Sequence, residues 1–262
     1  MPIIVLDPGH YEGYNPGVCP GYYEGNAMMK LAVYLGDMLS QMGATVKYTR
    51  TSNSQNPSLE ERGRTGAGAD MFLSLHSNAF DDPNASGVIT FYSVAQPGSQ
   101  PFAAEIGKAT AAAMGNQFRG TETRTLPSNS SLDYYGVIRA AVAAGTKNVM
   151  LNEQGFHTNP SDCAFLNSEE GLRALADAQA RAIGAYFGLQ PLPGPVVPVP
   201  PAPVPPVCDC RFYYTVQPGE YLYLIAKKFG VPWQAIAAAN GIEAPYIIFP
   251  GQKLIIPVPP AG

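Results

Sequence analysis

The sequence of 262 residues contains no apolar run of about 20 residues, the length that a membrane-spanning helix requires. Charged residues are also scarce, at 14% of the chain against about 25% in typical soluble proteins. The formal net charge is −4, so the chain lacks the excess of Lys and Arg that binds nucleic acid. We therefore expect neither a membrane span nor a nucleic-acid partner. The hydrophobic content of 46% is enough for a sizeable core and excludes general disorder.

Cysteines are few, and their spacing is irregular. The chain has four, Cys19, Cys163, Cys208 and Cys210, which are too few to predict a disulfide framework. Cys208-Asp209-Cys210 brings two thiols close together, but a zinc site needs more ligands. We expect ordinary thiols at all four positions.

The amino-terminal residues lack the features of a secretory signal peptide. Met1-Pro2 leads directly into the run IIVLD, without a basic start or a small-residue cleavage site. We expect either a mature secreted form or a protein that leaves the cell through lysis or a holin.

Proline, by contrast, is abundant and concentrated in one place. Nine of the 26 prolines lie within residues 191–206, PLPGPVVPVPPAPVPP. Proline fixes φ and removes backbone donors, so this stretch predicts a stiff polyproline II spacer of about 50 Å. A proline-rich ligand for another protein's groove is the alternative. The spacer predicts a first domain at 1–188, a linker at 189–211 and a second domain at 212–258.

The first domain alternates apolar strands with amphipathic helices. This alternation predicts an α/β fold of three layers around a mostly parallel sheet. Ligands bind such sheets at the carboxyl ends of the strands. The predicted strands are 3–6, 45–49, 71–75, 88–94 and 147–152, and the predicted helices are 24–42, a short one after Ser58, 99–118 and 168–187.

Polar residues follow three of the predicted strands at that edge. His10 comes after the first strand, His76 after the third and Glu153 after the last, while Glu24 opens the first long helix. Two histidines and a glutamate with one open position form a catalytic zinc pattern. We expect His10, Glu24 and His76 to bind zinc, and Glu153 to act as the base on an activated water.

Spacing alone leaves other interpretations open. The separations between these residues form no local metal-binding motif, so each could be an ordinary polar residue at the mouth of a loop. Glu12 and Asp133 are carboxylates that could take the role of Glu153. His157 lies in a turn-like stretch, where it is either a substrate-side group or a turn residue.

A series of short motifs extends over nearly all of residues 3–188. They are Val5–His10 (VLDPGH), Glu24, Thr49-Arg50, Leu59 with Arg62, Ala69-Asp70, Leu73–Asn78 (LSLHSN), Gly87-Val88 with Phe91-Tyr92, and Asn152–Asn159 (NEQGFHTN). In this order they resemble the motifs of the zinc-dependent N-acetylmuramoyl-L-alanine amidases of the type 3 family.

The resemblance implies a reaction and assigns residues to it. It implies that His10, Glu24 and His76 are the zinc ligands and that Glu153 is the catalytic carboxylate. The implied reaction is hydrolysis of the amide between the lactyl group of N-acetylmuramic acid and the L-alanine of the stem peptide. Three residues, in two places, depart from the family pattern. Tyr11-Glu12 stand where small glycines are frequent, and His157 replaces a small or aliphatic residue.

The second domain has the pattern strand, helix, helix, strand. The pattern predicts strands at 213–216 and 253–256 and helices at 222–229 and 233–240, a small βααβ unit. Its motifs Tyr214-Thr215-Val216, Asn240-Gly241-Ile242 and Pro250-Gly251-Gln252 resemble a LysM repeat. The resemblance implies binding of N-acetylglucosamine-containing glycan between two loops. The implied contacts are Gly219, Glu220, Tyr221, Leu222, Ile247, Ile248, Phe249 and Pro250.

Together the two domains predict a peptidoglycan hydrolase that its LysM domain holds at the bacterial cell wall. Two other classes remain open: a non-catalytic glycan-binding protein of the wall, and a zinc peptidase that acts on stem peptides. Both a phage endolysin and a bacterial autolysin fit the sequence, and the lack of signal-peptide features favours release by lysis or a holin.

Overall fold

The structure, a computed structural model, describes residues 1–192, 212–217, 220, 222–242 and 248–257. The chain divides into two compact units, Met1–Val196 and Val197–Gly262, and each is described by itself below. The predicted linker lies outside the described residues from position 193 onward, so its conformation stays a prediction. Among the described helices, none is both long and apolar enough to cross a membrane.

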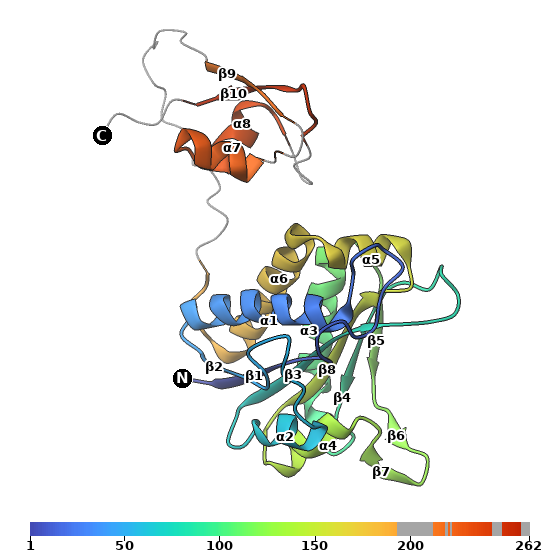
Figure 1. Cartoon of the computed structure of the whole chain (residues 1–262). Helices are drawn as coiled ribbons and strands as arrows, with labels where there is room; N and C mark the ends of the chain where they lie inside the picture. The colour runs from blue at the N-terminus through green and yellow to red at the C-terminus, as the bar shows by residue number, and fades with distance from the viewer. Residues whose placement is uncertain (193–211, 218–219, 221, 243–247, 258–262) are drawn as a thin grey trace. The chain divides into compact units, whose positions relative to one another are not determined.

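A six-stranded sheet of order β2-β1-β3-β8-β4-β5 forms the centre of the first unit (Figure 1). All neighbouring strands run parallel except β4 and β8. The reversal follows from the short loop 79–87 between β3 and β4, because a parallel crossover needs a dozen or more residues. The bounds are β1 (Ile3–Pro8), β2 (Thr45–Tyr48), β3 (Met71–Asn78), β4 (Val88–Tyr92), β5 (Phe118–Glu122) and β8 (Val149–Phe156).

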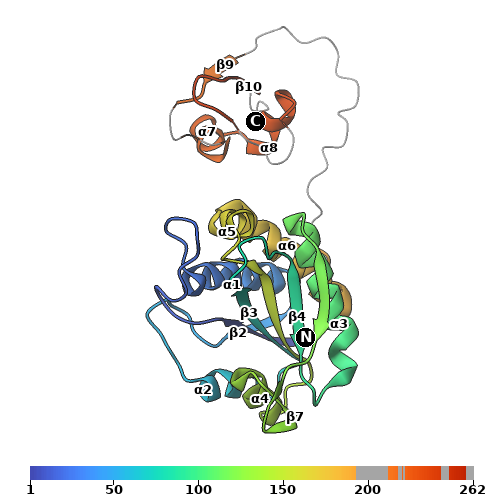
Figure 2. The same ribbon diagram turned by 90° about the vertical axis from the view of Figure 1, so that its right-hand side faces the viewer.

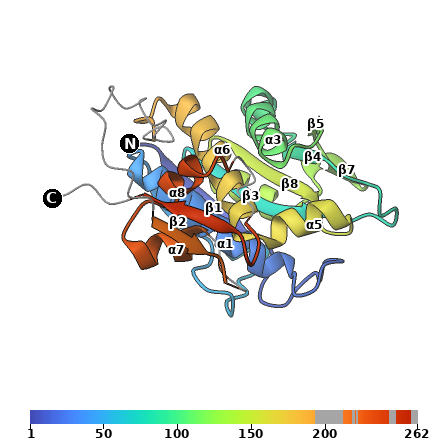
Figure 3. The same ribbon diagram turned by 90° about the horizontal axis from the view of Figure 1, so that it is seen from above.

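Helices cover both faces of this sheet, which confirms the predicted three-layer α/β fold (Figures 1 and 2). One face carries α1 (Glu24–Gln41), α3 (Gln100–Met114), α5 (Pro160–Asn167) and α6 (Glu169–Phe187). In Figure 3, α1, α3, α5 and α6 lie over the sheet strands. The other face carries α2 (Leu59–Arg64) and α4 (Gly136–Ala143).

Side-chain alternation along the strands separates two cores. On β1, Ile4 and Leu6 join the larger core under α1, α3 and α6, whereas Val5 joins the smaller core under α4. This alternation fixes which face each polar residue of the strands occupies. The remaining elements of the unit are η1 (Pro97–Ser99) and a hairpin of β6 (Thr125–Leu126) and β7 (Asn129–Asp133).

The second unit has the predicted βααβ order. It contains β9 (Phe212–Thr215), α7 (Leu222–Phe229), α8 (Trp233–Ala239) and β10 (Lys253–Ile256), and the two strands pair antiparallel. Its buried core includes Val216, Ile225, Ile236 and Leu254. Asn240 ties α8 to β10, because its side chain donates to Ile255 O and accepts from Ile255 N, at 2.8 and 2.7 Å.

Candidate metal centre

The structure brings His10, Glu24 and His76 together at the carboxyl edge of the sheet. Their ligand atoms lie within 4.8 Å of one another. His10 Nε2 is 3.4 Å from Glu24 Oε2, and His76 Nδ1 is 2.9 Å from Glu24 Oε1. The Glu24 carboxylate is buried, while the His10 side chain is 28% exposed, so the cluster is open toward His10. Three side chains from β3, α1 and the loop after β1 thus form a group that can hold a metal ion.

His10 and Glu24 are positioned by two neighbouring glycines, Gly9 and Gly25, whose backbones lie too close to other groups for a side chain. A Cβ at Gly9 would meet the His76 ring at 2.5 Å, and one at Gly25 would clash with the Tyr11 carbonyl. His10 adopts a φ of 56°, in the left-handed region that non-glycine residues seldom occupy. Such conformations persist where the surrounding structure enforces them, often at functional sites. The turn after β1 therefore folds back onto the first turn of α1.

The buried side chain of Arg50 links these two segments. Its guanidinium donates to the carbonyl oxygens of Pro8 and Gly9, at 3.1 and 3.2 Å, and also to Gly25 O. The first two carbonyls precede His10, and the third follows Glu24. In the sequence, Arg50 stands out only as part of a motif, because backbone carbonyl acceptors cannot be recognised from residue types.

Two further groups orient the Glu24 carboxylate. Asn15 Nδ2 donates to Oε2 at 2.7 Å, and the Ser77 amide donates to Oε1 at 3.0 Å. Hydrogen bonds of this kind fix the orientation of a metal ligand. Asn15 carries no signal in the sequence, and Ser77 is visible there only as part of the motif Leu73–Asn78, because its role depends on the fold that brings its amide to Glu24.

The charge states of Glu24 and His10 suit metal binding, whereas a proton on His76 would compete with a metal ion. Burial lowers the pKa of His10 to about 4, although Glu24 opposes the shift. Burial disfavours the charge on Glu24, but the hydrogen bond and charge of His76 outweigh it and lower the Glu24 pKa to about 2. Burial also disfavours the charge on His76, and the Glu24 carboxylate outweighs it, so the His76 pKa is raised. At neutral pH, Glu24 is thus an anion and His10 offers a lone pair, the forms that bind metal.

Glu153 lies beside this cluster on β8. It is in register with His76 on the parallel neighbour β3, so both side chains share the sheet face that α2 and α4 cover. Both line a cavity of about 350 Å³ together with Leu59, Asn78 and Tyr135. Among the described residues, Glu153 Oε2 is buried and has no hydrogen-bond partner. Burial raises the pKa of Glu153 to about 7, and Glu24 adds to the shift while His76 opposes it.

The strands continue past these polar residues, contrary to the predicted strand ends. β3 runs to Asn78 and β8 to Phe156, and the ladder still pairs Asn78 with Phe156. The prediction was wrong because His76 and Glu153 interrupt the apolar pattern without interrupting the backbone hydrogen bonds.

His157 belongs to a buried hydrogen-bond chain under Glu24. Its Nδ1 is 2.9 Å from Ser77 Oγ, which in turn is 2.7 Å from the Tyr22 hydroxyl. The nearest Glu24 oxygen is 4.0 Å from His157 Nδ1. His157 therefore supports the segment whose amide binds Glu24, and it also lines the cavity.

The two other candidate carboxylates lie elsewhere. Asp133 is buried and accepts from Ser93 Oγ and Val94 N, at 2.7 and 2.8 Å. Glu12 is exposed in the loop after His10. Neither lines the cavity, so Glu153 is the carboxylate positioned to serve as a base.

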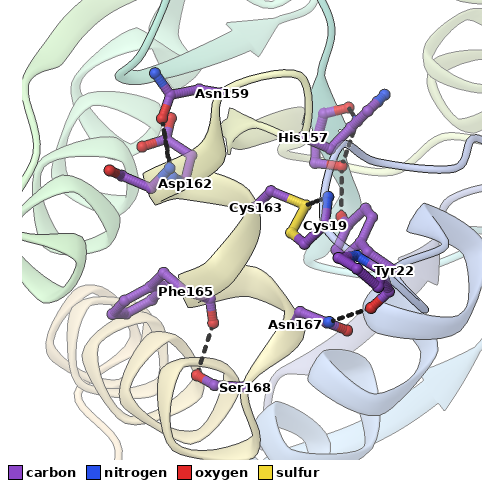
Figure 4. Close-up of a disulfide and its surroundings, with 12 residues drawn as sticks. Cys19, Tyr22, His157, Asn159, Asp162, Cys163, Phe165, Asn167 and Ser168 are labelled. Carbon is purple, nitrogen blue, oxygen red and sulfur yellow. Dashed lines mark hydrogen bonds between the residues drawn. A yellow bond between two sulfur atoms is a disulfide. The ribbon is translucent and has the colours of Figure 1, made fainter. Parts of the chain in front are cut away.

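A disulfide between Cys19 and Cys163 holds the loop 11–23 against α5 (Figure 4). The Cα atoms are 5.9 Å apart, and the two residues are separated by 144 positions. Asn167 Nδ2 also donates to Pro20 O at 3.2 Å, and Val18 N donates to His157 O at 3.0 Å. The expectation of ordinary thiols was wrong for this pair, because the two residues meet only in the folded chain. Cys208 and Cys210 lie outside the described residues.

The predicted glycan loops of the second unit are described in part. Gly219, Tyr221 and Ile247 lie outside the described residues. Glu220 accepts from Tyr214 Oη and Gln217 N, at 2.8 and 2.9 Å, and Phe249 is 66% exposed beside the exposed Pro250. The side chain of Leu222 packs in the core, and Ile248 packs against it. As glycan contacts, all of these residues stay predictions.

Comparison with known proteins identifies both units. The family model for N-acetylmuramoyl-L-alanine amidase matches residues 4–185, and the model for the LysM domain matches residues 214–257. The chain is 29% identical over 189 residues to "Probable cell wall amidase LytH" of Staphylococcus epidermidis, over 70% of this chain and 58% of that protein. It is also 29% identical to N-acetylmuramoyl-L-alanine amidase LytC of Bacillus subtilis, over 62% of this chain and 31% of that one. The chain thus spans less than two thirds of either relative.

A solved structure shows the same fold. The catalytic domain of CwlV, an N-acetylmuramoyl-L-alanine amidase from Bacillus (Paenibacillus) polymyxa var. colistinus, aligns with a TM-score of 0.63 and 25% identity. The alignment covers 72% of this chain and all of that domain. Because the amidase model alone matches more than half of the chain, the protein belongs to the N-acetylmuramoyl-L-alanine amidase family and carries a C-terminal LysM domain.

Proposed function

We propose that the protein is a zinc-dependent hydrolase of peptidoglycan that cleaves the amide between N-acetylmuramic acid and the L-alanine of the stem peptide. The observation that carries the proposal is the group of His10, Glu24 and His76 beside a buried Glu153 with a raised pKa. The family to which the chain belongs supplies the choice of substrate.

The donor set fits zinc. Two imidazoles and one carboxylate are the ligands of many catalytic zinc sites, which keep a further position open. Asn15 and the Ser77 amide orient the carboxylate, and the Gly9 turn leaves room for the His76 ring. When bound by these residues, zinc supplies Lewis acidity for activating water and polarising the scissile carbonyl.

Glu153 handles the proton in this reaction. Its free Oε2 accepts a proton from the attacking water and returns it to the amine of the departing L-alanine. Burial raises the pKa of Glu153, which makes it a better proton donor to the amine at neutral pH than an ordinary, fully ionised glutamate would be. Glu153 is only 9% exposed on the sheet face that α2 and α4 cover, so this proton transfer is shielded from bulk water.

The second unit supplies the attachment to the wall. We propose that its LysM domain binds the glycan strands, so that both units act on the same polymer. The disulfide is consistent with action outside the cytoplasm, because disulfides persist in oxidising compartments.

Product analysis tests this function. Digestion of purified sacculi is expected to release stem peptides with free L-alanine amino termini and to leave the glycan strands intact, as read by mass spectrometry. New amino termini within the stem peptide would show a peptidase instead. Binding to sacculi without any cleavage would show a non-catalytic wall protein.

Two further measurements test the residue roles. The Glu153→Gln variant is expected to lose activity by about 100-fold or more while it retains its zinc, measured by elemental analysis. Glu12→Gln is the matched control, and its activity should stay at the wild-type level. A chelator should abolish activity and added zinc should restore it; full activity in chelator, or in Glu153→Gln, contradicts the proposal.

A further inference from the structure

A second recess, of about 580 Å³, opens beside the metal centre. We call it the tyrosine recess. Its lining includes Tyr11, Tyr14, Asn56, Pro57, Leu59 and Glu61. It shares His10, Leu59 and Arg62 with the cavity that holds Glu153, so the two hollows meet at the metal cluster. A substrate whose scissile bond lies at the cluster can therefore extend one arm into each hollow.

The accessible surface of the tyrosine recess is shared about equally between polar groups and aromatic or apolar side chains. Tyr11 and Tyr14 are 37% and 39% exposed, and their ring centroids are 5.0 Å apart. Tyr14 also stacks on His10, with centroids 4.5 Å apart and planes at 17°. Leu59 is 50% exposed. Tyrosine offers a flat apolar face with a hydrogen-bonding tip, which suits a ring with an apolar face and polar edges.

The charges of the recess disfavour an acidic ligand. Glu61 is ionised at neutral pH like any exposed glutamate, and hydrogen bonds from the backbone and side chain of Ser58 lower its pKa further. The guanidinium of Arg62 is already engaged, since it donates to both oxygens of the buried Asp7 at 2.7 Å each. Arg64 also acts on Glu61, but it pairs with Glu60 and does not line the recess. The recess thus suits a neutral group that donates hydrogen bonds.

We propose that the tyrosine recess binds the sugar ring on the acyl side of the scissile amide. This inference rests on the proposed function, whose substrate has two chemically different arms. The sugar arm is a neutral pyranose with an apolar face and donating hydroxyl and amide groups. The peptide arm offers no ring for the tyrosines to stack on. It therefore extends into the cavity of Glu153, and Tyr11 stacks on the sugar.

Two soluble substrates that share one stem peptide test the assignment. One carries the N-acetylmuramoyl group, and the other carries only D-lactate, which keeps the scissile amide but lacks the sugar ring. In the full-length protein, Tyr11→Ala is expected to lower kcat/KM for the muramoyl peptide by about tenfold and to leave that for the lactoyl peptide unchanged. Tyr11→Phe keeps the ring and should restore most of the loss.

Tyr186→Ala is the matched control. Tyr186 is 52% exposed near the end of α6. Gln190, four residues later, donates its amide to Met42 O just after α1. Glu24 lies at the opposite end of α1, so Tyr186 lies far from the metal cluster. Equal losses on both substrates, or no loss on the muramoyl peptide, overturn the assignment while the proposed function stands. A wild-type protein that cleaves neither substrate overturns the proposed function together with the assignment.

Discussion

At the scale of single residues, the metal centre depends on one buried cation that touches none of the ligands' donor atoms. Arg50 is 2% exposed, and it donates to carbonyls on both sides of the cluster. A buried guanidinium is costly unless its donors are satisfied, so the arrangement favours one geometry of the two chain segments. Burial lowers the pKa of Arg50 to about 10, which still leaves it charged at neutral pH.

We predict that Arg50→Met weakens zinc binding by about 10–100-fold, because the carbonyls next to His10 and Glu24 lose their common donor. The zinc affinity of Arg50→Lys should lie between those of the wild type and Arg50→Met, since one ammonium group cannot reach all the acceptors that the guanidinium reaches. The measurement is zinc affinity by competition with a chromophoric chelator.

The control for this prediction is Arg173→Met, which removes an exposed pair with Glu169 and should leave zinc affinity unchanged. A folded Arg50→Met variant with wild-type zinc affinity would show that the two segments hold their positions without Arg50.

The residues of the centre were predictable to different degrees. His10, Glu24, His76 and Glu153 could be proposed because they interrupt or follow apolar runs of neighbouring strands, or open a helix, and because the motifs resemble a known family, although β3 and β8 continue past His76 and Glu153. Asn15, the Ser77 amide and Arg50 could not, since their roles depend on the path of the loop 11–23 and on carbonyl positions.

At the scale of elements, the loop 11–23 carries much of the site without regular secondary structure. It is held by the disulfide to α5 and by backbone hydrogen bonds to His157 and Glu24. Tyr22 from this loop is buried and reaches Ser77. The loop is therefore a fixed wall of the site, and the disulfide is its only covalent tie to α5 within the described chain.

We predict that the Cys19→Ser/Cys163→Ser double variant lowers the free energy of unfolding of the first unit by about 2–4 kcal/mol. The reason is that the cross-link joins positions 144 residues apart and so restricts the unfolded chain strongly. Urea unfolding followed by far-UV circular dichroism measures the change.

The second unit provides an internal control. Trp233 is the one tryptophan of the sequence, and it packs against the core of that unit. The unfolding transition seen by tryptophan fluorescence should therefore stay in place in the double variant. Two results would contradict the prediction: an unfolding transition of the first unit that is unchanged in the double variant, or alkylation of Cys19 in the native wild-type protein.

The sequence predicted the long elements well and the short ones poorly. α1 follows from its apolar periodicity, and α2 follows from its capping box, in which Ser58 accepts from the Glu61 amide. The edge strand β5 (FRGTE) and the β6–β7 hairpin were missed, because polar and half-exposed strands lack an apolar pattern. α4 was also missed, since eight residues are too few to show clear periodicity.

At the scale of the whole molecule, two units with separate cores share one chain. For the first unit, the alignment with the whole CwlV catalytic domain suggests that it can fold without the second. Leu192 still packs in its core, so the unit extends slightly beyond the predicted boundary at residue 188. A unit that folds alone but is tethered to a wall-binding module gains local concentration at its substrate.

We predict that a chain truncated after Leu192 keeps its core and cleaves a soluble muramoyl peptide with kcat/KM within about twofold of the full chain, since the metal centre and Glu153 lie wholly in the first unit. On insoluble peptidoglycan, its binding in a pull-down and its rate of lysis should fall, by up to about 100-fold, because it loses the tether that concentrates it there. The comparison needs both substrates, since a truncated chain that lost activity on each would be misfolded and not merely detached. Equal pull-down and lysis by the two chains would mean that the second unit does not anchor the enzyme to the wall.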